Sequence, residues 1–352
     1  MSPASIVVEA PLACLARAVL LAAPFLLGGC GTTIGPARGR PPQADADRLC
    51  APRAGGGRPA APLDGGSLSP EAFRAASERL SARGFSRAAI EMADVIGAAA
   101  PLLRMGELEA EGRRSTAAEL RVLRLRQAVM DRIMLAMLEV SGTLAAIDCE
   151  GERGDQLRVR LQGFETRRAR RLGLASIMVG ALTAALSGGL SVAGVATAGD
   201  IAGITGGVTE ASVGASLLFG SASGTFRTER NLLREVWERP ARSELFPPSV
   251  WRFLTRRPGG DPGQSTVAEV VVAEWRAAEL LGRGDPEEER SRAALLFGPG
   301  GTYGVEELEA RDAMLDLLEA SVALMSRDLR FLLEELMQPP ATSSYAKALV
   351  AR

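Results

Sequence analysis

The chain contains few of the side chains that carry enzyme chemistry. Histidine is absent from its 352 residues, which removes the commonest general base, the commonest metal ligand and the Ser-His or Cys-His pairs of many hydrolases. Lys347 is the only lysine, so a Walker-type phosphate loop, an internal Schiff-base lysine and a kinase-type Lys-Glu pair are missing too. The sequence therefore predicts no catalytic residue, no metal site and no cofactor.

Three motifs resemble enzyme sites but lack the partners that such sites need. Residues 344–347 match S-x-x-K without the companion S-D-N and K-T-G motifs. The glycine-rich segment 298–304 has no apolar strand before it and no lysine after it, so a loop between helices is expected. Glu287–Glu289 and Glu306–Glu307 fit the first turns of helices, where carboxylates complement the helix dipole. An enzyme on an unrecognised helical scaffold stays the second alternative.

The N-terminus has the pattern of a bacterial export signal. After Arg17 the apolar run AVLLAAPFLLGG is too short to span a bilayer and ends at Cys30. Residues 27–30, LGGC, resemble the lipobox of bacterial lipoproteins, whose signal peptide is cut before a cysteine that is then lipidated. The resemblance implies a signal peptide at 1–29, a lipid on Cys30 and, because Gly31 follows, an outer-membrane position facing the periplasm. An ordinary secretory signal with an incidental cysteine is the alternative.

The remaining cysteines bear on the redox state of the mature chain. Cys14 would leave with the signal peptide and Cys30 would carry the lipid, so Cys50 and Cys149 would remain in an oxidising compartment. We expect one disulfide between them, with two free or buried thiols as the alternative. Residues 30–67 are rich in glycine, proline and alanine and are predicted to form a flexible tether behind the lipid.

The elements that position these groups are predicted to be helices. Ser69 and Pro70 suit an N-cap and a first helical position, so a helical domain is expected over 68–340, with a break near Gly84, another at Pro101 and a tail at 341–352. A capping box at Thr116 starts a long amphipathic helix, of about 50 residues or in two parts in line, since Gly151 and Gly154 weaken it. The apolar residues at helical spacing in it are Leu120, Leu123, Met130, Ile133, Met137, Val140, Leu144 and Ile147.

Later segments continue the helical pattern. A helix capped by Ser265 or Thr266 and a final long helix from about Val305 to Met337 are predicted, and the three tryptophans are interpreted as core residues. Strand signals are few, because aromatic residues make up only 4% of the chain. The sequence predicts an all-α fold, a bundle of long antiparallel helices with a central Gly/Ala-rich apolar helical hairpin at residues 172–226.

The hairpin permits two interpretations. Residues 172–199 are long enough to span a bilayer, but only ten of these 28 residues are Leu, Ile, Met or Val, and Glu210 in the second half would cost about 2.5 to 3.5 kcal/mol at a membrane centre. The hairpin therefore either is buried in a soluble bundle or inserts into a membrane. Small residues that recur every four positions form a helix-packing strip, namely Gly199, Gly203, Gly207, Ala211 and Ala215.

Four arginines directly precede the hairpin: Arg167, Arg168, Arg170 and Arg171. They are either a solvated helix turn or a contact to anionic lipid headgroups. A net charge of -1 gives no global reason to bind nucleic acid. We expect a lipid-anchored cell-envelope protein with a non-enzymatic scaffolding or binding role, whose partner is an envelope protein or a second copy. The alternative is a membrane-inserting protein that uses the hairpin, which resembles helical pore-forming toxins in architecture only.

Overall fold

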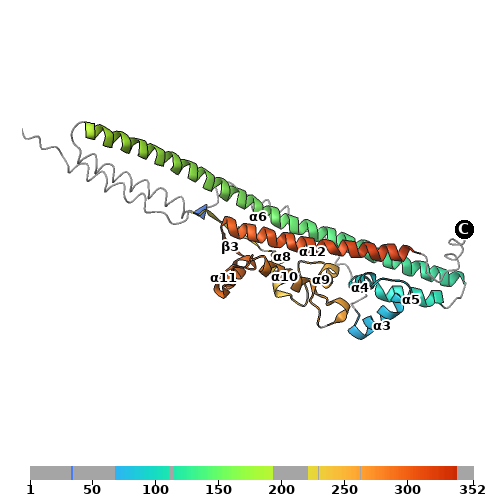
Figure 1. The fold of residues 1–352 in the computed structure, drawn as a ribbon. Helices are drawn as coiled ribbons and strands as arrows, with labels where there is room; N and C mark the ends of the chain where they lie inside the picture. Colours follow the sequence, from blue (N-terminus) through green and yellow to red (C-terminus); the bar gives the residue numbers. More distant parts are fainter. Residues whose placement is uncertain are drawn as a thin grey trace, which may run out of the picture. The chain divides into compact units, whose positions relative to one another are not determined.

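The computed structural model describes residues 33–34, 68–110, 115–192, 221–228, 230–261 and 263–338 (Figure 1). Helices account for most of the described residues, which confirms the predicted all-α bundle. The chain divides into two compact units: unit 1 holds residues 1–36, 157–225 and 302–305, and unit 2 holds residues 37–156, 226–301 and 306–352. The predicted signal peptide, the tether except Thr33 and Ile34, and the tail lie outside the described residues.

Unit 2 consists of one long helix pair and a layer of shorter helices. The pair is formed by α12 (Val305–Met337), whose bounds confirm the prediction, and by the first part of α6 (Thr116–Val192). The shorter helices are α3 (Pro70–Ser81), α4 (Arg87–Val95), α5 (Ala99–Ala110), α8 (Leu232–Glu238), α9 (Pro248–Thr255), the 3-10 turn η2 (Pro258–Gly260), α10 (Val267–Ala277) and α11 (Pro286–Leu296).

Local signals set most of the helix starts. The Ser69 side chain accepts a hydrogen bond from the backbone N–H of Ala72, so α3 begins at the predicted cap. At α10 the Thr266 hydroxyl accepts from the N–H of Glu269 and the Glu269 carboxylate accepts from the N–H of Thr266, which is a complete capping box. Ser69 and Thr266 therefore act as the sequence predicts.

Two predicted boundaries are wrong. The chain turns at Gly97, which has a φ of 72°, and Pro101 lies in the first turn of α5, where a missing N–H removes no helical hydrogen bond. The cap of α6 is Ser115 rather than Thr116, because the Ser115 hydroxyl accepts from the N–H of Ala118. Helix α6 also runs without interruption through Gly151 and Gly154 as far as Val192.

Helices α6 and α12 lie side by side and antiparallel within unit 2 (Figure 1). Arg126 Nη2 donates to the carbonyl of Leu336 at one end of the contact, and Glu150 contacts Arg311 at the other. The buried residues of both helices alternate at three- and four-residue spacing, as in a coiled coil. We call these residues the α6–α12 seam: Val129, Ile133, Ala136, Val140, Thr143, Ile147 and Glu150, facing Leu308, Arg311, Leu315, Leu318, Val322, Met325, Leu329, Leu332 and Leu336.

Only some of the apolar residues predicted to form the buried face of α6 are buried. Ile133, Val140 and Ile147 are buried as predicted, whereas Leu120, Leu123 and Met137 are at least half exposed and Met130 and Leu144 are half-buried. The difference follows from the helical repeat. The residues that α12 buries recur every 3.5 positions on average, whereas a straight α-helix has 3.6 residues per turn, so the two repeats mark different residues as one face. Helix α6 therefore has two apolar faces, of which the seam covers one.

The three tryptophans lie on the shorter helices, and one of them joins this layer to the long pair. Trp275 is fully buried and its Nε1 donates to the carbonyl of Met314 over 3.1 Å, which ties α10 to α12. Trp237 stacks on Phe297 with ring centroids 4.6 Å apart, and Trp251 is buried. Burial of Trp251 and Trp275 confirms their interpretation as core residues.

A small sheet, which the sequence did not predict, joins three separate segments. Its strands are β1 (Thr33–Ile34), β2 (Ser223–Arg227) and β3 (Gly300–Tyr303), in the order β1-β2-β3, with β1 parallel to β2. Strands of two to five residues are too short to show a two-residue alternation in the sequence. In unit 1 the strand β2 lies close to α6, since a Cβ at Gly224 would be 2.9 Å from Leu157 Cδ1 and Glu165 accepts from the N–H of Ala222.

Substitution of Gly300 is expected to destabilise unit 2. This residue has a φ of +119°, and a Cβ there would lie 2.3 Å from the Phe226 carbonyl oxygen and 2.7 Å from Arg227 Cα. We expect Gly300→Ala to lower the free energy of unfolding by about 3 kcal/mol in urea denaturation, because backbone strain and overpacking add. Gly154→Ala is the matched control: a Cβ there meets nothing within 4 Å, so a gain of about 0.5–1 kcal/mol is expected. Equal effects at both positions would contradict the close approach.

Candidate functional site

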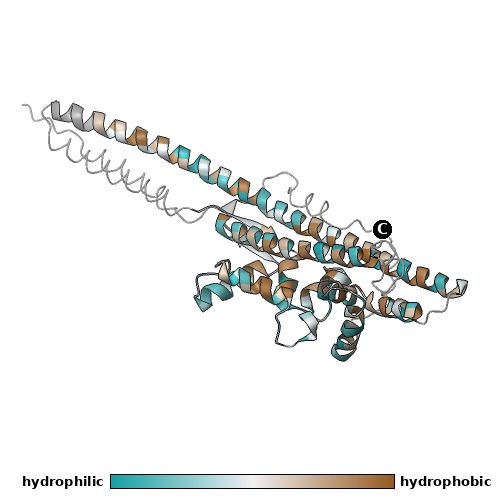
Figure 2. Ribbon diagram, turned by 45° about the vertical axis from the view of Figure 1, so that its right-hand side comes forward, coloured by the Kyte–Doolittle hydropathy of each residue, from teal (hydrophilic) through white to brown (hydrophobic). Residues whose placement is uncertain are grey.

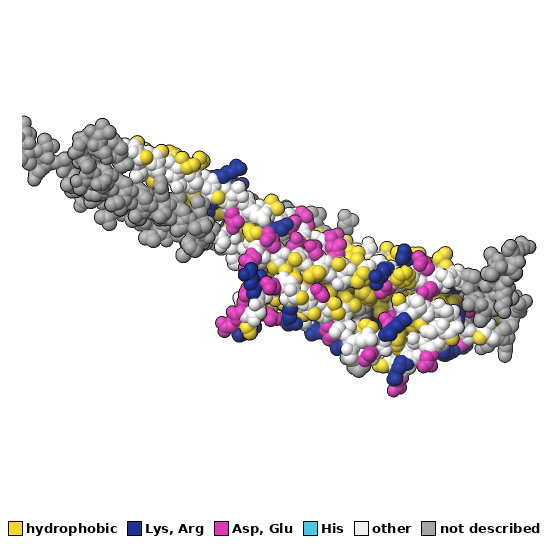
Figure 3. All heavy atoms as spheres, in the orientation of Figure 1, with side chains coloured by type: hydrophobic (Ala, Val, Ile, Leu, Met, Phe, Trp, Pro, Cys, Tyr) yellow, Lys and Arg dark blue, Asp and Glu magenta, His cyan; other side chains and the backbone are white. Residues whose placement is uncertain are grey.

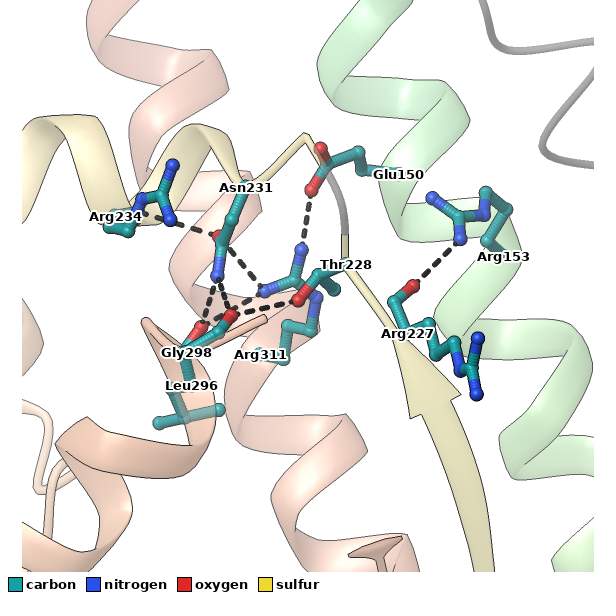
Figure 4. Close-up of polar contacts among 9 residues, drawn as sticks. All are labelled: Glu150, Arg153, Arg227, Thr228, Asn231, Arg234, Leu296, Gly298 and Arg311. Carbon is teal, nitrogen blue, oxygen red and sulfur yellow. Dashed lines mark hydrogen bonds and ion pairs between the residues drawn. The ribbon is translucent and has the colours of Figure 1, made fainter. Parts of the chain in front are cut away.

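A network of buried polar groups lies where α6 meets α12 (Figure 4). Arg311 of α12 is 1% exposed, and its Nη2 donates to the Glu150 carboxylate of α6. Both residues occupy positions of the α6–α12 seam that are otherwise mostly apolar. A charge in such a position is strongly destabilising unless an opposite charge and further hydrogen bonds compensate it.

Asn231 supplies further hydrogen bonds to this network. It is fully buried in front of α8, and its Nδ2 donates to the carbonyls of Leu296, over 2.7 Å, and Gly298, over 3.1 Å. Its Oδ1 accepts from the backbone N–H of Arg234 and from Arg311 Nη1, each over 3.4 Å. One side chain thereby connects α8, α12 and the loop between α11 and β3 (Figure 4).

The end of β2 completes the network. Arg153 Nη2 donates to the Arg227 carbonyl over 2.9 Å, and the Thr228 hydroxyl donates to the Gly298 carbonyl over 3.0 Å. The guanidinium carbons of Arg153 and Arg311 lie 5.3 and 5.7 Å from the centroid of the Phe226 ring, within the range of cation–π attraction. The network therefore joins four segments of unit 2 that are distant in the sequence.

The chemistry open to this network is limited by its enclosure. Burial raises the pKa of the Glu150 carboxyl, while the positive charges of Arg311 and Arg153 oppose that shift. Glu150, Arg311, Asn231 and Arg153 are each no more than 9% exposed, so a substrate has no direct access to them. The geometry suits a structural role that sets the register of α6 against α12. The sequence interpretation missed it, although Arg311 between Leu308 and Leu315 is a charge at seam spacing.

The four arginines predicted as membrane contacts lie on α6 in unit 1, within one and a half turns. Arg167, Arg170 and Arg171 are exposed and Arg168 is half-buried. In Figure 3, dark blue basic and yellow apolar side chains are neighbours on the part of α6 that precedes the grey residues. The structure thus presents basic groups to solvent at this place in the helix.

Large apolar side chains are exposed directly after the arginines. Leu174 is 64% exposed, Ile177 70%, Met178 65% and Leu182 60%. Figure 2 shows the change along α6, from hydrophilic turns to the hydrophobic turns before the grey segment. Their spacing places the four on one side of the helix, where a basic cluster adjoins an apolar surface. We call residues 167–182 the Arg-apolar segment.

Other predicted site residues are not tested by this geometry. Cys30, Cys50 and the strip from Gly199 to Ala215 lie outside the described residues, as do residues 193–220 of the predicted hairpin. Cys149 is half-buried on α6. No helix within the described ranges combines the length and hydropathy that crossing a membrane requires.

Two of the three motifs with enzyme-like residue types lie within the described residues. Glu287, Glu288 and Glu289 lie in the first turn of α11, and Glu306 and Glu307 in that of α12. The glycine-rich segment contains the strand β3, so the expectation of a loop between helices is wrong for residues 300–303. Residues 344–347 lie outside the described part.

The described part of the chain has few features of a metal site or a small-ligand site. It contains no group of three or more His, Cys, Asp or Glu side chains that could hold a metal ion. A cavity of about 350 Å³ is lined by Arg83, Arg126 and Met337 among others. Arg83 donates to the Leu102 carbonyl and to Glu109, and Arg126 donates to Leu336, so both guanidinium groups already have partners within the protein.

Comparisons with protein-family models, with curated proteins and with solved structures find no match to the chain.

Proposed function

We propose that this protein is a lipid-anchored cell-envelope protein with a non-enzymatic scaffolding role, which places the Arg-apolar segment on an anionic membrane surface. The observation that carries the proposal is the exposure of Leu174, Ile177, Met178 and Leu182 immediately after four arginines. Basic residues attract anionic headgroups, and an apolar helix face gains free energy when it enters the boundary between headgroups and acyl chains. The proposed location is the periplasmic face of an outer membrane, on the strength of the LGGC sequence and Gly31.

Substitution of Cys30 tests the lipid anchor. We expect Cys30→Ser to prevent lipidation and to move a substantial share of the mature chain from the membrane fraction to the soluble fraction of cells. A single acyl chain binds membranes only marginally, so a lipoprotein-type anchor with several chains is what the substitution would remove. Cys14→Ser, in the signal peptide, is the matched control and should leave the distribution unchanged. Identical fractionation of both variants would contradict the anchor.

A disulfide between Cys50 and Cys149 is part of the same proposal. Cys149 is half-buried on α6, and every other cysteine of the chain lies outside the described residues. Cys50 is the proposed partner because Cys14 and Cys30 are assigned to the signal peptide and the lipid. Such a bond would link the predicted tether to the long helix α6.

Quenching by brominated lipids tests the membrane contact. We expect the added fluorescence of Ile177→Trp to be quenched by anionic vesicles with bromine on the acyl chains, since this position is 70% exposed on the proposed contact face. The native protein is one control, because Trp251 and Trp275 are buried. Val270→Trp, at an apolar position of unit 2 that is 48% exposed, is the matched control. Absence of quenching at position 177, or equal quenching at position 270, would exclude the contact.

The depth of quenching separates surface contact from a second candidate function. Insertion of the 172–226 hairpin, as in a membrane-inserting protein, is favoured by the same exposed apolar side chains. Bromines close to the headgroups should quench Ile177→Trp most if the helix lies in the interface, and bromines near the acyl-chain ends should do so if the hairpin inserts.

A further inference from the structure

The side of α6 that does not face α12 is exposed along unit 2. Its exposed positions alternate at four- and three-residue spacing and include Arg124, Asp131, Met134, Leu138, Ser141 and Glu152. We call this stripe the outer face of α6. Met134 and Leu138 in its middle are 62% and 65% exposed. Adjacent large apolar side chains with this exposure on a regular helix face are typical of a surface that another helix covers.

Charge is distributed unevenly along the outer face. Arg121 and Arg124 lie toward the N-terminal end, Asp131 lies nearer the middle, and Glu152 lies toward the C-terminal end; all four are exposed. Acidic residues repel anionic lipid headgroups, so a membrane does not fit the whole face. A helix with the same sequence in the antiparallel direction does fit it, because each basic end then meets an acidic end.

The sizes of the side chains on the outer face also suit an antiparallel pair of identical helices. Arg124 and Glu152 each lie fourteen residues from Leu138, and Met134 and Gly142 each lie four residues from it. A two-fold axis at Leu138 would therefore place Met134 of one copy opposite Gly142 of the other, where a Cβ would meet nothing within 4 Å. Large residues would face small ones, and Arg124 would face Glu152 at both ends, about 42 Å apart. A parallel copy would instead place Arg124 opposite Arg124.

We propose that the outer face of α6 binds a second copy of this chain, antiparallel, about a two-fold axis at Leu138. The surface is separate from the Arg-apolar segment and the inference does not rest on membrane contact. A dimer would double the number of lipid anchors and of Arg-apolar segments per particle.

Cysteine cross-linking tests both the contact and its direction. In the mature chain, Leu138→Cys should form a disulfide-linked dimer under mild oxidation, because the two copies of position 138 meet at the axis. Arg124→Cys alone and Glu152→Cys alone should stay uncross-linked, and an equimolar mixture of the two should form the dimer. Cross-linking of Arg124→Cys or Glu152→Cys with itself would indicate a parallel arrangement, and no dimer of Leu138→Cys would indicate another occupant. Either result overturns the proposal.

Charge exchange gives an independent readout without added cysteines. Sedimentation velocity of the Cys30→Ser chain should give a dimer mass, and Arg124→Glu or Glu152→Arg alone should weaken dimerisation at least tenfold. The double variant Arg124→Glu/Glu152→Arg restores opposite charges across the axis and should recover most of the affinity. The exposed positions keep folding effects small. A monomer mass for the unsubstituted Cys30→Ser chain at any accessible concentration, or a double variant no better than either single one, would contradict the dimer.

Discussion

Substitution of Arg311 by methionine should lower the free energy of unfolding by about 3–5 kcal/mol in chemical denaturation. The cost arises because Glu150, 6% exposed, would then lie in the α6–α12 seam without its main opposite charge, and breaking a buried ion pair from one side costs about this much. Asn231 would also lose one of its hydrogen-bond partners. Arg327→Met on the solvent-facing side of the same helix is the matched control, with an expected change within about 0.5 kcal/mol.

The dependence of this loss on pH identifies its cause. Removal of Arg311 should raise the pKa of Glu150 further, since burial already raises it and one opposing charge is gone. A carboxyl whose pKa is raised in the folded state favours folding most below its ordinary pKa of about 4.3 and loses that contribution as the pH rises through the raised value. The loss in Arg311→Met should therefore be smallest near pH 4 and grow toward neutral pH. A loss that is constant with pH would indicate packing rather than charge.

Replacement of both Glu150 and Arg311 distinguishes an effect on the register of α6 against α12 from an effect on the free energy of unfolding. Glu150→Leu/Arg311→Leu removes both charges from the seam and should recover most of the stability lost in Arg311→Met, because apolar replacements of buried ion pairs are often neutral or stabilising. If the pair sets register, this double variant should be stable and yet less uniform in the alignment of α6 against α12.

Replacement of all four arginines by serine should weaken binding to anionic vesicles up to about 1,000-fold. Each basic residue close to an anionic surface contributes about 1 kcal/mol, so the four together contribute about 4 kcal/mol. The substituted positions are Arg167, Arg168, Arg170 and Arg171. The measurement is the partition coefficient of the chain without residues 1–30 in co-sedimentation with vesicles.

Two controls show whether a loss of vesicle binding comes from the lost charge or from a change in the fold. The corresponding quadruple lysine variant keeps the charge and should bind within a few-fold of the native segment, and added salt should weaken native binding because exposed charges are screened. Serine substitution that leaves binding intact would show that the arginines are an ordinary solvated turn.

Short-range signals in the sequence predicted much of the fold. Ser69 with Pro70, and Thr266 with Glu269, are local capping patterns and act within three residues, so their outcome does not depend on the rest of the fold. The bounds of α12 followed from its regular apolar spacing and from the prolines after it. Exposure of three of the four arginines fits either sequence interpretation of the cluster.

Features that depend on distant segments were missed. The buried pair of Glu150 and Arg311 is separated by 161 positions in the chain, and no local rule links the two. The choice between the two apolar faces of α6 depends on α12, which the helical period alone does not place. The short strands depend on pairing between segments, as with Thr33 and Ser223.

Vesicle flotation of the chain without residues 1–30 tests the central claim most directly, because the signal peptide and the lipid anchor are then both absent and only the rest of the protein can bind the membrane. The account predicts flotation with vesicles that contain anionic phospholipid and little flotation with neutral vesicles. A chain that stays at the bottom of the gradient with both kinds of vesicle would contradict membrane contact by the Arg-apolar segment.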